Sequence, residues 1–268
     1  MSEPARGGRR GGSGDEPHGR WIFGIQPARE AIEVHGAQLL RVLVEERPRE
    51  AQQLEAVARF ARDRGAHVER VDRAALDRIA HGERHQGVAI EAAPLRLLDE
   101  TALLEGRAGA PPLVIALDEL TDPQNFGAIV RSAVALGASA VAWPEDRSAP
   151  LSAAMTRASA GAVEHARLCR VTSLPRLLGT LADAGLSVIG LDAGATDHLH
   201  VLELDKPLCL VVGAEGKGLR NATKQRCTAI AKLPMPGPIA SLNASVAAAI
   251  AIYEVVRART HASGERTR

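Results

Sequence analysis

The sequence predicts an α/β protein in which a small α/β domain precedes a larger domain built on a parallel sheet. Short apolar runs alternate with helical patterns along nearly the whole chain. In the second half these runs are almost free of polar residues, as is typical of strands buried on both faces. A segment rich in Gly, Ala and Pro separates the halves. The 268 residues suit about two domains.

Composition sets only loose limits on function. The net charge is +1, and aromatic residues make up 2% of the chain, so a platform of stacked aromatic side chains for RNA is not expected. Cys169, Cys209 and Cys227 are spaced too widely for a disulfide framework or a zinc site. No apolar run is long enough to span a membrane. We therefore expect a soluble protein of the reducing cytoplasm that uses no metal.

Residues 1–19 are rich in Gly and Arg and almost lack apolar side chains, so they are predicted to be a disordered tail. Such a tail suits weak phosphate binding, but a solvated tail without function is the simpler interpretation. Residues 20–94 follow as a compact α/β unit in which Pro27 suits a first helical turn and Gly65 a helix end. Its expected elements are helices at 27–34, 50–65 and 73–80 and strands at 41–46, 66–71 and 87–93.

Residues 95–112 are predicted to be a loose linker, residues 113–260 the larger domain and residues 261–268 a tail. The larger domain is expected to contain strands at 113–118, 139–143, 166–171, 187–192, 208–213 and 228–233, with helices at 124–136, 173–184 and 243–259. In the last helix, Leu242, Val246, Ile250 and Tyr253 have helical spacing and are predicted to be mostly core. The alanines between them permit close helix packing, including packing across a dimer interface.

Three segments punctuated by glycine and proline follow predicted strands: 120-LTDPQNFGAIVRSA-133, 211-VVGAEGKGLR-220 and 233-LPMPGPIASLNASVAAAIA-251. In open α/β sheets, ligands usually bind at these carboxyl ends. In the first segment Asn125 precedes a helix that carries Arg131. Taken alone, Asn125 would be a helix cap and Arg131 a solvated side chain. In the third segment, Ser241, Asn243 and Ser245 stand at a helix start, where Ser245 fits a capping role as well as a functional one.

The second segment is a glycine loop of an unusual kind. Its G-x-x-G-x-G spacing is not the dinucleotide fingerprint, which argues against a dehydrogenase-like protein, and Lys217 is followed by Gly218, unlike a Walker loop. Glu215 would repel phosphate. A cationic sulfonium ligand therefore suits this loop better than a nucleotide tail.

Together the three segments resemble the signature motifs of the SpoU-type RNA ribose 2'-O-methyltransferases of the SPOUT superfamily, and the resemblance extends over residues 21–259. The segment 83-ERHQGVAIEA-92 is similar to the end of the ribosomal-protein-like RNA-binding domain that precedes the catalytic domain in many members. The resemblance implies a sheet tied in a trefoil knot, S-adenosylmethionine as the methyl donor, and a homodimer whose subunits share the active site.

The resemblance also assigns roles to single residues. It implies donor contacts at Gly213, Leu233 and Leu242, and catalytic or site-holding roles for Asn125, Arg131, Glu215, Ser241 and Asn243. Arg84 and Arg220 are candidate RNA contacts because of their charge and loop positions. For Glu215, a dimer-stabilising contact to the partner's Arg131 fits as well as a catalytic one.

The expected substrate is a guanosine ribose of 23S ribosomal RNA, because the transfer-RNA enzymes of the family usually lack the N-terminal domain. A transfer-RNA guanosine methylase and a ribosomal-RNA adenosine methylase remain alternatives. From another class, a non-catalytic RNA-binding factor in ribosome assembly would also keep this fold. His81 with His85 and His198 with His200 lack acidic companions in a metal motif, so core or solvated roles are expected for them.

Overall fold

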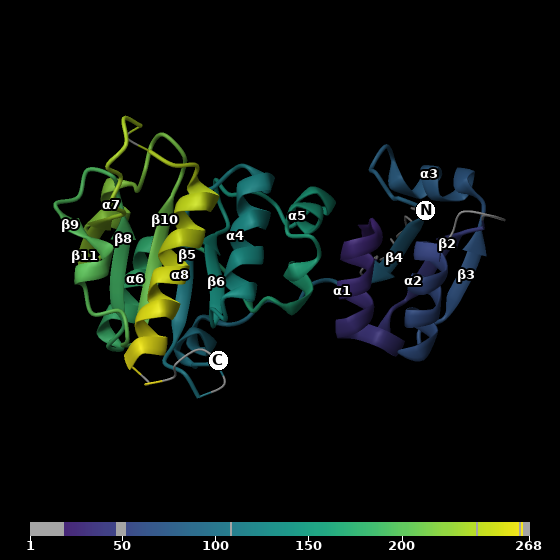
Figure 1. Ribbon diagram of the computed structural model, residues 1–268, viewed down its shortest axis with the longest axis horizontal. Helices are drawn as coiled ribbons and strands as arrows, with labels where there is room; N and C mark the ends of the chain where they lie inside the picture. Colours follow the sequence, from purple (N-terminus) through teal and green to yellow (C-terminus); the bar gives the residue numbers. More distant parts are fainter. Residues whose placement is uncertain (1–18, 47–51, 108, 240, 263, 265–268) are drawn as a thin grey trace, which may run out of the picture.

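The computed structural model describes residues 19–46, 52–107, 109–239, 241–262 and 264. These residues form two α/β domains that lie side by side, with the larger, C-terminal domain on the left in Figure 1. The tail predicted at residues 1–19 lies outside the described residues except for Gly19, and most of the tail predicted at 261–268 does as well. Among the described helices, none is both long and apolar enough to cross a membrane.

The N-terminal domain is a four-stranded sheet with helices on both faces. The strand order is β1-β4-β2-β3, where β2 and β3 are parallel and the other pairs antiparallel. The strands are β1 (Arg20–Phe23), β2 (Arg41–Glu45), β3 (Val68–Val71) and β4 (Val88–Ala92). Helices α1 (Ile25–His35) and α2 (Gln52–Asp63) cover one face, and α3 (Arg73–Ala80) covers the other.

The pleat of β2 explains this division, because successive side chains of a strand point to opposite faces. Val42 and Val44 pack under α1 and α2, whereas Leu43 packs under α3. The predicted elements of this domain are confirmed within a few residues, and α3 has the predicted bounds. Strand β1 was not among the predicted elements.

The segment between the domains is more ordered than the predicted loose linker. Leu98 donates a backbone hydrogen bond of 2.7 Å to the carbonyl of Leu168, so this part of the chain extends the edge of the large sheet. The short 3₁₀ helix η2 (Glu100–Leu104) follows, and its Leu103 is fully buried against the sheet. The segment is therefore packed onto the C-terminal domain.

The C-terminal domain contains a seven-stranded sheet in which every pair is parallel, as predicted. Its strand order is β7-β6-β5-β10-β8-β11-β9. The strands are β5 (Leu113–Asp118), β6 (Ala140–Pro144), β7 (Leu168–Val171), β8 (Ser187–Leu191), β9 (Asp197–His198), β10 (Leu208–Gly213) and β11 (Ala229–Lys232). The trefoil knot in this domain stays a prediction.

Helices cover both faces of this sheet. Helices α4 (Pro123–Ala135) and α8 (Ala244–Ala262) lie side by side on one face, and α6 (Leu174–Asp183) lies on the other (Figure 1). The short helix α7 (Asn221–Lys224) precedes β11. Helix α5 (Ala153–Ala158) and the 3₁₀ helix η3 (Ala162–His165), which were not predicted, lie between α4 and the N-terminal domain.

The prediction that the large side chains of α8 form its core face was wrong. The exposed fractions of Leu242, Val246, Ile250 and Tyr253 are 40%, 46%, 44% and 57%. The buried face of α8 consists mainly of small residues, Ala244, Ala248 and Ala251, together with Ile252 and Val255. The physical reason is close packing, since alanines let α8 approach the sheet and α4 closely. A stripe of large apolar side chains is thereby left on the surface.

Candidate active site

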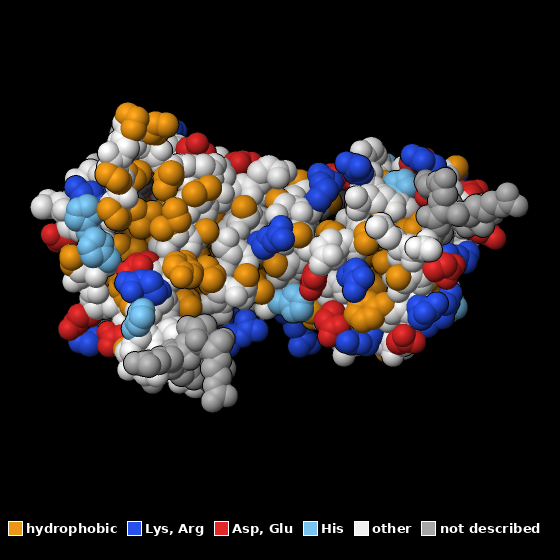
Figure 2. Space-filling view, viewed as in Figure 1, with side chains coloured by type: hydrophobic (Ala, Val, Ile, Leu, Met, Phe, Trp, Pro, Cys, Tyr) orange, Lys and Arg blue, Asp and Glu red, His pale blue; other side chains and the backbone are white. Residues whose placement is uncertain are grey.

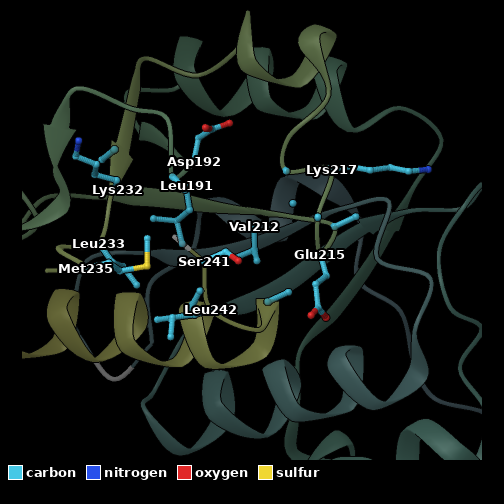
Figure 3. A pocket seen from close by; sticks show the side chains of 18 of the residues that line it. Leu191, Asp192, Val212, Glu215, Lys217, Lys232, Leu233, Met235, Ser241 and Leu242 are labelled. Carbon is cyan, nitrogen blue, oxygen red and sulfur yellow. The ribbon is translucent and has the colours of Figure 1, made fainter. Parts of the chain in front are cut away.

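The second and third motifs meet at the carboxyl edge of the sheet around a cavity of about 340 Å³. The cavity lies where β8, β10 and β11 end and where α8 begins. Figure 3 shows the side chains of Leu191, Val212 and Leu242 gathered toward its centre, while Lys217 extends outward. Its volume is within the range of small-molecule sites, and its walls combine apolar and charged side chains.

The glycine loop after β10 forms one wall and explains why glycine is needed at Gly213. A Cβ atom at that position would lie 2.3 Å from the carbonyl carbon of Gly218. The loop closes on itself through a 2.9 Å hydrogen bond from the amide of Gly218 to the carbonyl of Ala214. Gly216 and Gly218 have φ angles of 76° and 64°, which favour glycine. The loop thus presents backbone to the cavity.

A polar cluster at the rim of the cavity joins all three motifs. The Asn125 side-chain amide donates to Glu215 Oε2 at 3.3 Å, and that of Asn243 donates to the same oxygen at 3.2 Å. Asn243 also donates to Asn125 Oδ1 at 2.9 Å. Three side chains separated by 90 and 28 residues in the sequence therefore form one hydrogen-bonded unit.

Helix capping fixes the two asparagines in this unit. Asp122 caps α4 by accepting hydrogen bonds from the amides of Gln124 and Asn125, so the interpretation of Asn125 as the cap was wrong. Asn243 caps α8, because its Oδ1 accepts from the amides of Ser245 and Val246 at 2.9 and 3.3 Å. Ser245 Oγ donates to the same oxygen at 2.6 Å, which is a structural role.

Arg131 does not join the cluster within one chain. It is exposed, and it has no hydrogen bond or ion pair with another residue that the structure describes. Asn125 is six positions earlier on α4, so the two side chains leave the helix about 120° apart. Ser241, Leu233 and Leu242 line the cavity. Their roles in catalysis and donor binding stay predictions.

The two candidate RNA contacts differ in their surroundings. Arg84 is exposed in the loop after α3 and pairs with no other described residue. The guanidinium of Arg220 donates to the buried Asp118 at 2.7 Å and also pairs with Glu119 at 3.2 Å. Arg220 thus ties the glycine loop to the end of β5. Its contact with RNA stays a prediction.

An ion pair at the cavity was missed by the sequence reasoning. Asp192, directly after β8, lies 2.5 Å from Lys224 Nζ and accepts a 2.9 Å hydrogen bond from the amide of Gly194. The hydrogen bond from Lys224 lowers the pKa of Asp192 despite its partial burial. The sequence feature that could have identified this site was an acidic residue at the carboxyl end of a predicted strand.

The histidines have structural partners. His85 is buried; its Nδ1 accepts from the backbone amide of Gly87 at 3.0 Å, so its Nε2 donates to Asp77 Oδ1 at 3.0 Å. His198 and His200 stack with ring centroids 5.4 Å apart. Among the described residues, no three His, Cys, Asp or Glu side chains are close enough to hold a metal ion.

The cavity fits a ligand with a flat apolar part and a positive centre. Apolar side chains such as Leu233 and Leu242 form part of its lining. The charged lining residues are Glu215, Asp192, Lys217, Lys224 and Lys232. Asp192 and Lys224 pair with each other, so among the described residues Glu215 is the lining carboxylate that has no cationic partner. The residue types needed to bind a sulfonium compound are therefore present.

Two family models together match nearly all of the described chain. Residues 112–253 match the SpoU rRNA Methylase family, and residues 21–98 match the RNA 2'-O ribose methyltransferase substrate binding model. The 23S rRNA (guanosine-2'-O-)-methyltransferase RlmB of Xylella fastidiosa is 39% identical over 243 residues, which cover 90% of this chain and 97% of that protein.

A protein of Mycobacterium avium named an uncharacterized tRNA/rRNA methyltransferase is 47% identical over 176 residues. That segment covers 65% of this chain and 57% of the mycobacterial protein, so the match spans little more than half of that relative's length. Among solved structures, the SpoU methyltransferase AviRb of Streptomyces viridochromogenes in complex with the cofactor AdoMet has a TM-score of 0.71 and 24% identity, with 90% of each chain covered. This likeness shows a shared fold.

Proposed function

Because the chain belongs to the SpoU rRNA methylase family, we propose that it methylates the ribose 2'-hydroxyl of a guanosine in 23S ribosomal RNA, with S-adenosylmethionine as the methyl donor. The observation that carries the proposal is the cluster of Asn125, Glu215 and Asn243, which brings the three motifs together at the rim of one cavity. With ribosomal RNA as the substrate, the proposed reaction takes place in the cytoplasm.

The donor belongs in the cavity at the carboxyl edge of the sheet. The backbone of the loop after Gly213 and the side chains of Leu233 and Leu242 would hold it. When bound, S-adenosylmethionine supplies an activated methyl group. The carboxylate of Glu215 at the rim favours a positive centre there, and the two asparagine amides hold that carboxylate in place.

Arg131 is the residue proposed to bind the RNA next to the reacting 2'-hydroxyl. An arginine keeps its proton at physiological pH, so it is a poor general base. Its planar fork suits the phosphate next to the target ribose, and binding that phosphate would orient the 2'-hydroxyl. The proton of this hydroxyl would pass to that phosphate or to solvent as the methyl group moves from the donor sulfur to the 2'-oxygen. Correct orientation alone lowers a barrier by about 7 to 11 kcal/mol in favourable cases.

The substitution Arg131→Lys separates these roles, because lysine keeps the charge but loses the fork. We expect turnover to fall strongly while donor affinity stays unchanged. Turnover close to that of the wild type would exclude an essential grip by the guanidinium. The matched control is Arg96→Lys, which changes an arginine in the segment between the domains, away from the three motifs.

A homodimer accounts for two features that a single chain leaves unexplained. Arg131 points away from the Asn125 cluster, and the apolar stripe of Val246, Ile250 and Tyr253 on α8 is exposed. Figure 2 shows apolar side chains gathered over α8 and on the rim above it. Because α4 packs beside α8, pairing of two such faces would carry Arg131 toward the partner's cluster.

The test of the reaction uses purified protein, labelled S-adenosylmethionine, and deproteinised 23S ribosomal RNA or total transfer RNA from cells lacking the gene. We expect label in ribosomal RNA alone, recovered as 2'-O-methylguanosine by mass spectrometry. Label in transfer RNA, or in 2'-O-methyladenosine, would replace the proposed substrate with one of the two related ones. Donor binding without transfer to any RNA or ribosomal particle would favour a non-catalytic assembly factor.

A further inference from the structure

The two domains meet at an interface built from charge as well as shape. On the C-terminal side it is formed by α5 and η3, which lie between α4 and the N-terminal domain in Figure 1. On the N-terminal side it is formed by β1 and α1. The motifs do not include any of these four elements.

Glu164 of η3 is the centre of the charged contacts. Its side chain has no exposed surface, yet both carboxylate oxygens are bound by the N-terminal domain. Arg20 donates to Oε1 at 2.7 Å and also to Oε2, and His35 Nε2 lies 2.8 Å from Oε2. Burial opposes ionisation of this carboxyl, but the hydrogen bonds from His35 and Arg20 outweigh burial and lower its pKa.

Further ion pairs cross the same interface. His165 Nε2 lies 2.9 Å from Glu30 of α1, and Arg157 of α5 pairs with Glu83. These contacts run in both directions: Arg20 and His35 of the N-terminal domain contact Glu164, whereas His165 and Arg157 of the C-terminal domain contact acidic residues of the N-terminal domain. Contacts in both directions specify one register between two surfaces.

Shape specifies the same register independently. Gly161 has a φ angle of 86°, and a Cβ atom there would lie 2.7 Å from the Cα of Pro27 and 2.9 Å from the Cβ of Glu30. The backbone before η3 therefore approaches α1 more closely than any other residue type allows.

The interface is connected to the helix that carries Asn125 and Arg131. Gly127 of α4 packs directly on α5, where a Cβ atom would lie 2.6 Å from Met155 O and 2.8 Å from Ser159 N. Ser159 is fully buried, and its Oγ donates to Thr156 O at 2.8 Å. The N-terminal domain is thus joined to α4 by tight contacts on both sides of α5 and η3.

We propose that Glu164 is a positioning residue for the RNA substrate: by binding Arg20 and His35, it fixes the RNA-binding domain against α4. This inference rests on the proposed function. An RNA held by the N-terminal domain then reaches the catalytic rim in one orientation. Because the two domains are already ordered, RNA binding does not have to supply the entropy cost of ordering them. Without the contact, the domains sample several orientations, and only some of them present RNA productively.

The test is Glu164→Gln, which keeps the shape and removes the charge. We expect kcat/KM for deproteinised 23S ribosomal RNA to fall on the order of tenfold. The loss should lie in KM for RNA, whereas kcat at saturating RNA and donor affinity by calorimetry stay close to wild type. Small-angle X-ray scattering should show a wider spread of interdomain distances. The control is Glu100→Gln, which breaks a 2.7 Å ion pair with Arg176 that does not cross the interface.

Unchanged RNA KM together with an unchanged scattering profile would overturn the inference, as would a loss of kcat alone. If Glu164→Gln fails to fold, Arg20→Gln with His35→Gln removes the same contacts from the partly exposed side and should give the same KM effect. Gly161→Ala should reproduce the wider scattering without any change of charge. If the wild type transfers no methyl group, the proposed function fails, while scattering and RNA binding on filters still test the fixed arrangement.

Discussion

At the residue scale, Asn243 connects folding to the site. Its Oδ1 caps α8, while its amide nitrogen holds Asn125 and Glu215. The sequence indicated that a Ser or Asn caps this helix and singled out Ser245 for that role, whereas the structure shows that Asn243 is the cap. The contacts to Asn125 and Glu215 span 118 and 28 residues, so only the resemblance to a family pointed to them.

Substitutions distinguish the two roles of Asn243, which are the cap of α8 and the contacts to Asn125 and Glu215. Asn243→Asp keeps a capping oxygen but loses the amide donor and places a second carboxylate beside Glu215. We expect a large loss of methyl transfer, and a loss of stability that comes from repulsion between the two carboxylates and not from the helix cap. Asn243→Ala should lose activity and also about 1 kcal/mol of the free energy of unfolding. Thermal unfolding and a methyl-transfer assay measure both, and full activity in Asn243→Asp would show that the amide is dispensable.

The lowered pKa of Glu164 leads to the prediction that the stability of the protein depends on pH. Its pKa is lower in the folded protein than the ordinary value of 4.5, because the contacts with His35 and Arg20 outweigh its burial. Such a carboxyl stabilises the fold at pH values above its unfolded pKa, and the contribution is lost as the pH falls through the lower folded pKa. The groups that face it are Arg20 and His35, with the Glu30–His165 pair adjacent.

We therefore expect the unfolding midpoint of the wild type to fall between about pH 5 and about pH 3 more steeply than that of Glu164→Gln. Differential scanning calorimetry across this range provides the comparison. Parallel curves for the two proteins would show that Glu164 is not ionised in a stabilising contact.

At the scale of elements, apolar strands and long helices were predictable, whereas short helices were not. Strands β5 and β10 have the predicted bounds because six consecutive buried residues form each of them. Helix α5 has six residues and η3 has four, which is too short for a periodic pattern. Yet they carry the domain interface, whose paired residues lie 74 to 144 positions apart in the sequence.

The glycine loop gives a test at this scale. Gly213→Ala would place a methyl group 2.3 Å from the backbone of Gly218, so the loop must move and the cavity wall with it. We expect donor affinity, measured by calorimetry, to fall by at least about tenfold. Gly179→Ala is the matched control, because its added Cβ atom meets no atom closer than 3.7 Å. Equal affinity in both variants would exclude this loop as the donor wall.

At the scale of the whole molecule, the helical spacing in α8 was predicted correctly, but its large apolar side chains were assigned to the core and lie on the surface. The spacing of Val246, Ile250 and Tyr253 indicates one helical face, but a sequence does not distinguish a face buried in its own core from one exposed on the monomer surface. The alanines decide the matter, because they pack on the sheet and leave the larger side chains outside. This exposed stripe is the proposed dimer surface.

Ile250→Glu places a charge in the middle of that stripe, and we expect a monomer by light scattering at concentrations where the wild type is a dimer. The exposed Val201, at 64% exposure and outside the stripe, provides the control variant Val201→Glu. A dimer in both variants would place the interface elsewhere.

Sharing of the active site is tested by mixing two inactive variants. If Arg131 acts in the partner's site, then Arg131→Ala and Asn243→Asp subunits form heterodimers with one complete site, and activity partly returns. Activity that stays absent, although heterodimers form, would place Arg131 and Asn243 in the same subunit's site.

The central claim is transfer of a methyl group to a ribose 2'-oxygen, and alkaline hydrolysis of the labelled RNA tests it most directly. A 2'-O-methyl group removes the hydroxyl that attacks the adjacent phosphodiester, so that bond survives alkali. After incubation of the wild-type protein with labelled S-adenosylmethionine and 23S ribosomal RNA, label is predicted in alkali-stable dinucleotides that begin with guanosine. Label confined to mononucleotides would mean methylation of a base and would contradict the account.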